Sequence, residues 1–287
     1  MTVKEVATHL RMKERKLYDM VSRQELPSVR IGGKWLFPRS RIDAWVIARL
    51  EGPATARLAP TALIAGSHDP LLEWAVRESG AELPLLQDSS LQGLERLATS
   101  GAIAAGLHLL DAANGEYNVG IVASRFAHEP MVLITWAMRE QGLVVATDNP
   151  LQITGVADLA PLRLAVRQKE AGSYLLLLHL LEAAGLPATL LLAKGTALRS
   201  EQDVALAVAD GRADAGLAVA SVARQLRLGF VPLHRERFDL LVWRKSYFEP
   251  PFQRLLALTR TSTFVERAMA LGGYDVTDLG RVRWIGE

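Results

Sequence analysis

The chain of 287 residues contains no cysteine, no long apolar run and no apolar signal core. The lack of cysteine excludes disulfides, thiolate metal sites and cysteine nucleophiles, and gives no sign of an oxidising compartment. No apolar stretch reaches the roughly 18 residues of a membrane span. The N-terminus is charged from Lys4 onward, unlike a signal peptide. We therefore expect a cytoplasmic protein with no membrane partner.

Common catalytic motifs are also missing. The sequence has no Gly-x-Ser-x-Gly elbow, no Gly-x-x-x-x-Gly-Lys phosphate loop and no Gly-x-Gly-x-x-Gly after a strand. His108 and Asp111 are spaced to share a helical face, but no third ligand stands near them. A Ser–His–Asp triad would need Ser67 or Ser90 together with His68 or His108. We predict no catalytic residue, no metal, no cofactor and no enzymatic activity.

Positive charge is concentrated in the first fifty residues. Residues 1–50 contain four Lys and seven Arg against five Asp and Glu, which gives about +6. Since the whole chain carries +2, the remainder carries about −4. A basic segment at one end of a chain favours a polyanionic partner.

The same segment has the pattern of three helices and a hairpin. Thr2 and Glu5 have the capping-box spacing at the start of a first helix. A second helix is predicted over about 13–23, and Leu26-Pro27 ends it. Two short strands, 28–31 and 35–38, flank Gly32-Gly33, a hairpin signal. A third helix is predicted over 39–49, with Ile42, Trp45 and Val46 facing inward.

This order resembles the excisionase-type, MerR-like winged helix-turn-helix domain. The resemblance covers almost all of residues 1–50. It is carried by Val3-Lys4-Glu5-Val6-Ala7, Arg15-Lys16-Leu17-Tyr18, Glu25-Leu26-Pro27 and Val29-Arg30-Ile31-Gly32-Gly33-Lys34-Trp35. It implies that the second helix enters the major groove of double-stranded DNA and that the hairpin wing lies on the backbone. The implied DNA-binding residues are Arg15, Lys16, Tyr18, Arg30, Lys34 and Arg39. An ordinary solvated charged face is the alternative for any one of them.

Residues 61–287 follow a linker at 51–60 and alternate strand-like with helix-like segments. This alternation predicts an α/β domain with a mostly parallel sheet and crossover helices. Strand-like runs lie at 63–65, 83–86, 103–107, 132–136, 144–146, 163–166, 190–192, 215–218 and 240–242. Ligands bind in such sheets beyond the carboxyl ends of the strands, near helix N-termini.

Small hydroxyl residues, amides and glycines occupy several of the predicted turns. Exposed N–H groups and the positive end of a helix dipole make such turns suitable for anions. Plain N-capping explains each of these residues singly. The turns carry Ser67 with His68, Ser89 with Ser90, Asn149 with Thr154, and Gly172 with Ser173.

A second resemblance covers about 61–245. The chain looks like the periplasmic-binding-protein-like sensor domain of some bacterial one-component regulators, a domain also fused to molybdenum-cofactor biosynthesis proteins. The resemblance rests on Gly66-Ser67-His68-Asp69, Ser90-Leu91-Gln92-Gly93-Leu94, Ala105-Gly106-Leu107-His108-Leu109-Leu110-Asp111, Gly115-Glu116-Tyr117-Asn118, Arg139-Glu140-Gln141-Gly142-Leu143, Asp148-Asn149-Pro150, Arg167-Gln168, Ala171-Gly172-Ser173 and Ala209-Asp210-Gly211-Arg212-Ala213-Asp214-Ala215-Gly216.

The resemblance implies a type II fold of two lobes, about 61–136 with 240–287 and about 137–239, joined by strands that cross near 134–144 and 234–241. The ligand lies between the lobes, and related domains hold oxyanions such as molybdate, tungstate or sulfate. The implied ligand-binding residues are Ser67, His68, Ser89, Ser90, Tyr117, Asn149, Thr154, Arg167, Gly172 and Ser173. One departure is that Arg167-Gln168 lacks the preceding Asn of many members, and Ser173-Tyr174 replaces their Gly-Ser-Gly-Thr-Arg run. The alternative to ligand binding by Arg167 is an ion pair with a carboxylate across the cleft.

Three hypotheses follow. The first is a transcriptional regulator that binds an operator as a homodimer and senses a small anion, either molybdate or tungstate or a carboxylate such as formate. The second is an accessory of molybdenum-cofactor metabolism that does not bind DNA. The third is a hydrolase or transferase that uses the cleft. The basic first segment favours the first.

Overall fold

The computed structural model describes residues 1–47, 49, 59–160, 162–187 and 197–287. The chain divides into two units, Met1–Leu58 and Ala59–Glu287. Most of the predicted linker and the predicted strand at 190–192 lie outside the described residues.

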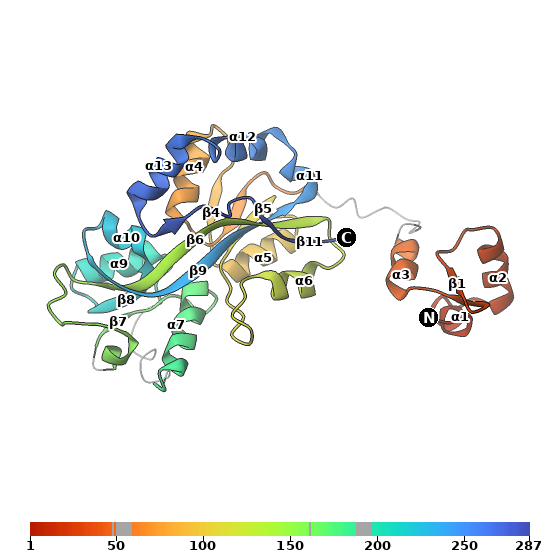
Figure 1. The fold of residues 1–287 in the computed structure, drawn as a ribbon, viewed down its shortest axis with the longest axis horizontal. Helices are drawn as coiled ribbons and strands as arrows, with labels where there is room; N and C mark the ends of the chain where they lie inside the picture. The colour runs from red at the N-terminus through yellow and green to blue at the C-terminus, as the bar shows by residue number, and fades with distance from the viewer. Residues whose placement is uncertain (48, 50–58, 161, 188–196) are drawn as a thin grey trace. The chain divides into compact units, whose positions relative to one another are not determined.

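The first unit has the predicted order of helix, helix, hairpin and helix (Figure 1). Thr2 and Glu5 form the predicted capping box at the start of the first helix. Gly32 and Gly33 make the hairpin turn with φ of +57° and +79°, a region that glycine enters without strain. The elements are α1 (Val3–His9), α2 (Glu14–Ser22), β1 (Val29–Ile31), β2 (Lys34–Leu36) and α3 (Arg39–Ile47).

A small apolar core holds these elements together. Val6, Leu17, Leu26, Phe37 and Ile42 are its most buried members. Trp45 packs against this core, and its indole nitrogen donates to the carbonyl of Glu25. The expectation for Val46 was wrong, because its side chain is 36% exposed. Ile42 and Trp45 already fill the inner face of α3.

The second unit is built on a mixed sheet with the strand order β4-β3-β5-β9-β6-β8-β7. Strands β10 and β11 pair with β6 away from this path. The bounds are β3 (Ile64–Gly66), β4 (Leu85–Gln87), β5 (Ala104–Leu107), β6 (Met131–Val145), β7 (Leu164–Ala165), β8 (Ala215–Val219), β9 (Gly229–Trp243), β10 (Tyr274–Asp275) and β11 (Val282–Ile285).

Two 15-residue strands, β6 and β9, run through the middle of the sheet as an antiparallel pair (Figure 1). The sequence pattern predicted two separate strands, 132–136 and 144–146, in place of the single β6. Polar Arg139, Glu140 and Gln141 break the apolar run, yet they lie inside the strand. The expected mostly parallel sheet was also wrong. Among the described strands, only β3–β4, β3–β5 and β7–β8 pair in parallel.

Helices cover both faces of this sheet (Figure 1). One apolar cluster packs α4, α12 and α13 on the sheet, and a second packs α5 and α6 on its opposite face. Toward β7 and β8, two further clusters lie under α7 and under α9 with α10. The helices are α4 (Pro70–Glu78), α5 (Ser90–Ala98), α6 (Val119–Phe126), η1 (Val156–Leu159), α7 (Gly172–Ala183), α9 (Glu201–Ala209), α10 (Ala220–Gln225), α11 (Arg244–Tyr247), α12 (Pro250–Leu258) and α13 (Ser262–Leu271).

Candidate functional site

Helix α2 presents a polar face with a basic pair. Leu17 and Val21 are buried on its inner side, whereas Arg15, Lys16 and Tyr18 are exposed. The helical period explains this division, because residues 17 and 21 are four apart and share one face. The exposed guanidinium, ammonium and phenol groups can contact phosphates or base edges.

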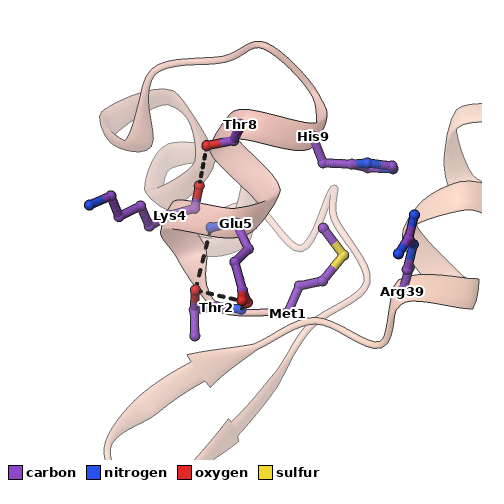
Figure 2. Close-up of a pocket in the computed structure, with 7 residues that line it drawn as sticks. All are labelled: Met1, Thr2, Lys4, Glu5, Thr8, His9 and Arg39. Atoms are coloured by element: carbon purple, nitrogen blue, oxygen red, sulfur yellow. Dashed lines mark hydrogen bonds between the residues drawn. The ribbon is translucent and has the colours of Figure 1, made fainter.

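The remaining predicted DNA-binding residues are exposed as well. Arg30 and Lys34 lie on either side of the hairpin turn, and the Arg30 guanidinium lies 5.7 Å from the centre of the Trp35 ring. Arg39 begins α3, 3.9 Å from the Asp43 carboxylate. Figure 2 shows Arg39 across a groove of about 630 Å³ from the side chains of α1. Every Lys and Arg of residues 1–50 is exposed, so the charge of this unit is available to a partner.

In the second unit, the sheet brings together two of the predicted serines. The hydroxyls of Ser67, after β3, and Ser90, at the start of α5, lie 2.8 Å apart. Ser90 also accepts from the backbone N–H of His108, which follows β5. Two glycines allow this approach, because a Cβ on Gly66 would lie 2.5 Å from the Gly106 oxygen and one on Gly93 would lie 2.7 Å from the Gly66 Cα. The serine pair uses one hydroxyl proton in its shared bond, which leaves the other able to donate to an anion.

The first turn of α7 lies against His108. A Cβ on Gly172 would be 2.7 Å from the His108 carbonyl oxygen and 2.8 Å from its ring carbon Cε1, so only glycine fits there. Ser173 is 1% exposed. Its hydroxyl has no hydrogen-bond partner among the described residues. A buried hydroxyl without a partner at a helix N-terminus is a ready donor for a bound acceptor.

Arg167 stands just before this turn and is 9% exposed. Burial lowers the pKa of its guanidinium, and the nearby Glu201 and Asp203 partly offset that effect. Its Nε donates to the Leu198 carbonyl at 3.2 Å. Within the described ranges Arg167 forms no ion pair, so the alternative of a carboxylate partner across the cleft is not realised there. A buried guanidinium without a direct ion pair is costly, which favours an anion beside it.

Sequence reasoning missed a buried cluster of charged groups on the crossing strands. Arg139 on β6 pairs with Glu236 opposite it on β9 and lies 3.0 Å from the Asp69 carboxylate. Glu236 also bonds the His108 ring at 2.8 Å. Burial opposes ionisation of Glu236, but Arg139 and His108 outweigh it and hold its pKa at about 2. The interrupted apolar run of β6 was the available signal.

The same cluster extends from the crossing strands toward both sides of the sheet. Gln141 on β6 donates at 3.0 Å to Glu236 and to Glu201, the first residue of α9. Glu201 also accepts from the Val219 N–H at the end of β8. Asp69 caps α4 and accepts from the Tyr274 hydroxyl at 2.7 Å. The cluster therefore connects the elements around β3 with those around β8.

Some predicted ligand residues lie elsewhere. The Asn149 carboxamide donates to the Ile153 carbonyl and accepts from the Ile153 N–H within its own turn, and the Thr154 hydroxyl donates to the Asp158 carboxylate. In the antiparallel pair, Gln141 lies opposite Val219 and Val145 opposite Ala215, so residues after β6 lie at the edge where β8 begins. The four residue steps from Gln141 to Val145 span about 13 Å. Strand β7 runs parallel to β8 and pairs with its first residues, so the chain leaves β7 toward Arg167 and α7 in the direction opposite to that in which it leaves β6 toward Asn149 and Thr154.

Other predicted residues have structural partners. Ser89 is the N-cap of α5 and makes a capping box with Gln92, as plain capping requires. His68 bonds Glu73 at 2.9 Å. The Tyr117 hydroxyl lies 2.8 Å from the His234 ring nitrogen Nε2. Burial, with Glu236 nearby, raises the pKa of Tyr117 above its usual range, so it stays a neutral hydroxyl.

The predicted His108–Asp111 spacing brings no ligands together, because His108 bonds Glu236 whereas Asp111 accepts from Ala113 and Asn114 in its own turn. In the described part of the chain, no three His, Asp or Glu side chains are grouped to hold a metal ion. Nor does any described helix combine the length and apolarity of a membrane span.

Comparison with known families matches both units. The PBP superfamily domain matches residues 73–260, and the helix-turn-helix domain matches residues 1–49. A Bacillus subtilis (strain 168) relative, uncharacterized protein YvgK, is 28% identical over 303 residues, covering 98% of this chain and 96% of the relative. A Clostridium pasteurianum protein from the ferredoxin 2Fe-2S gene 5′ region is 30% identical over 80 residues, 28% of this chain and 71% of that protein.

Among solved structures, a hydrogen-peroxide-bound cysteine-to-serine mutant of Corynebacterium glutamicum OxyR is similar, with a TM-score of 0.53 and 14% identity. The match covers 94% of this chain and 89% of that one, and at this identity it shows the fold alone. Both sequence resemblances and the α/β fold class are thereby confirmed. The chain belongs to the PBP superfamily and joins that domain to an N-terminal helix-turn-helix domain, as a ligand-binding regulator does.

Proposed function

We propose that this chain is a one-component transcriptional regulator that binds an operator through residues 1–50 and a small anion through residues 61–287. The observation that carries the proposal is the presence, in one chain, of an exposed basic helix-turn-helix unit and a binding-protein-like unit. The basic side chains supply phosphate contacts. The second unit supplies the switch, and the chain acts without enzymatic turnover.

The anion site is the edge of the sheet where β3, β5 and β7 end. Three features support it: the unpartnered buried hydroxyl of Ser173, the buried guanidinium of Arg167 and the spare proton of the Ser67–Ser90 pair. All are donors, and they are joined by the N–H groups of the first turn of α7. Molybdate and tungstate are the anions that the resemblance implies, and formate represents the carboxylate alternative.

The switch requires that the anion prefer one arrangement of the two predicted lobes, because a ligand that binds both arrangements equally shifts nothing. The crossing strands β6 and β9 carry the buried Arg139–Glu236 pair close to the predicted boundary of those lobes. One recognition helix and one wing cover a short half-site, so we propose a homodimer on a two-fold symmetric operator.

A gel-shift assay on the chain's own upstream DNA tests this function at about 150 mM salt, where non-specific binding is weak. We expect a shifted complex with this fragment and not with a scrambled fragment of equal length. Equal binding to both fragments would support the competing accessory of molybdenum-cofactor metabolism, whose first unit does not read DNA.

A thermal-shift series tests the anion site. Molybdate, tungstate, sulfate and formate at millimolar concentration are compared with chloride at equal ionic strength, and a ligand that binds only the folded state raises the midpoint. Ser173→Ala is the matched variant, since it deletes a hydroxyl that has no partner in the described residues and leaves the fold intact. We expect it to reduce the anion response. A response unchanged by this substitution would place the anion elsewhere.

A further inference from the structure

A polar cavity of about 350 Å³ lies beside the anion site. One wall is the segment that ends β4 and begins α5, and it leads directly into Ser89 and Ser90. The other wall includes the segment between Arg167 and Gly172. The residues that line the cavity are Gln87, Asp88, Gln92, Gln168, Glu170 and Arg199.

The lining is rich in hydrogen-bonding groups that carry no charge. Three of the six side chains are glutamine carboxamides, each with a donor and an acceptor. Gln92 uses its oxygen in the α5 capping box, which leaves its NH₂ group for the cavity. Carboxamides of this kind suit hydroxyl and amide groups, which also donate and accept.

The charges of the lining sum to zero once Asp88 is counted together with its partner outside the lining, Arg96. Asp88 is paired with Arg96 at 2.6 Å. Glu170 and Arg199 remain, one of each sign, and neither forms an ion pair with a described residue. A second anionic group in this cavity would gain from Arg199 and lose beside Glu170, so an uncharged occupant fits best.

The size of the cavity also favours an occupant larger than an oxyanion. A volume of about 350 Å³ is within the range of roughly 300–1,000 Å³ found for small-molecule pockets. A tetrahedral oxyanion has only five non-hydrogen atoms. Held beside Ser173 and Arg167, it would leave the glutamine-lined cavity filled with water.

We propose that the effector is an organic anion and not a bare oxyanion. Its carboxylate or phosphoryl group lies against Ser173, Arg167 and the first turn of α7. Its uncharged body, rich in hydroxyl or amide groups, fills the cavity between Gln87 and Gln168. This inference rests on the anion site proposed above and narrows its ligand class.

The test is a thermal-shift titration of the full chain with matched pairs of probes. Inorganic phosphate is compared with glycerol 3-phosphate and glucose 6-phosphate, and acetate with gluconate. Molybdate and tungstate complete the panel. We expect an apparent dissociation constant at least about tenfold lower for an organic member than for its head group alone, a difference of ~1.4 kcal/mol.

Two variants separate the head group from the body. Gln168→Leu, at a half-buried position on the cavity wall, removes hydrogen bonds at similar size. We expect it to abolish the organic advantage and to leave the response to the inorganic ion unchanged. Ser173→Ala is expected to weaken both. Far-ultraviolet circular dichroism establishes that each variant is folded.

The outcomes are distinguishable. Equal or tighter binding of molybdate, tungstate or phosphate than of every organic member overturns this inference and leaves the proposed function standing. An organic advantage that survives Gln168→Leu also overturns it, because the body then lies outside the cavity. A midpoint insensitive to the whole panel overturns the anion site itself, whereas loss of operator binding in the gel shift overturns the regulator.

Discussion

The two units of the chain differ in the burial of their key charged side chains. In residues 1–50 every Lys and Arg is exposed, and the segment carries about +6. In the second unit, Arg139, Glu236, Asp69 and Glu201 are all at least nine-tenths buried. Exposed charges attract a polyanion over the range of salt screening. Buried charges instead fix the arrangement of the strands that carry them, since breaking one pair leaves the partner buried and alone.

This difference indicates where binding and switching reside. The first unit can lose one charge and stay folded, because each exposed charge contributes little to stability. The second unit ties the elements around β3 to those around β8 through a single cluster. A ligand at the neighbouring edge can therefore act on the arrangement of the whole unit.

The largest expected effect comes from Arg139→Met. This substitution leaves the Glu236 and Asp69 carboxylates buried without their cation. We expect the second unit to lose about 3–5 kcal/mol in free energy of unfolding, measured by urea titration with circular dichroism. Arg212→Met is the control, because Arg212 pairs with Asp210 at the surface and should contribute under about 1 kcal/mol. Equal losses in the two variants would contradict the contrast.

The stability of the second unit at acidic pH should also depend on this cluster. The folded-state pKa of Glu236, at about 2, lies below its ordinary value of 4.5. A depressed pKa stabilises the fold above pH 4.5, and that contribution is lost as the pH falls from 4.5 toward 2. We expect the urea midpoint of the wild type to decrease more steeply over this window than that of Glu236→Gln. Parallel curves would mean that Glu236 is not held ionised.

A smaller effect on stability, but a clear one on binding, is expected in the first unit. Arg15→Ala combined with Lys16→Ala removes two exposed charges from α2. We expect operator affinity to fall by about tenfold or more and the salt dependence to flatten by about one per lost phosphate contact. Fluorescence anisotropy with labelled operator measures both. The double substitution Arg227→Ala and Lys245→Ala, a matched loss of two exposed charges in the second unit, should leave operator affinity unchanged.

The smallest expected effect concerns the hairpin turn. Gly33 has a φ of +79°, and no atom lies within 4 Å of the position that a Cβ would occupy there. Gly33→Ala should cost about 1 kcal/mol through backbone strain alone. Gly33→Asn should cost less, because asparagine tolerates this region. The thermal midpoint of the first unit measures both variants, and equal midpoints for alanine and glycine would mean that the turn relaxes.

The first unit was largely predictable because its signals are local. Capping at Thr2, the Gly32-Gly33 turn and the stop at Leu26-Pro27 each act within a few residues. Val46 was expected to face inward because it lies four residues after Ile42, but Ile42 and Trp45 already fill the inner face of α3.

The second unit was less predictable because its site depends on pairing between distant segments. Ser67 and Ser90 meet through strand order, and Gly172 meets His108 although they are 64 positions apart in sequence. Asn149 looked equivalent to Ser173 in its local pattern, yet the antiparallel register of β6 and β8 puts it at the other edge. Arg139 and Glu236 were missed because charged residues inside a strand suggest a loop until their partners are known.

The central claim is that an anion at the edge of the second unit controls DNA binding by the first. The most direct measurement is the anisotropy of labelled upstream DNA titrated with the full chain, with and without a saturating organic anion that raises its thermal midpoint. We predict at least about a tenfold change in operator affinity, about 1.4 kcal/mol of coupling, that disappears in Ser173→Ala. An operator affinity that is identical with and without the bound anion would contradict the account.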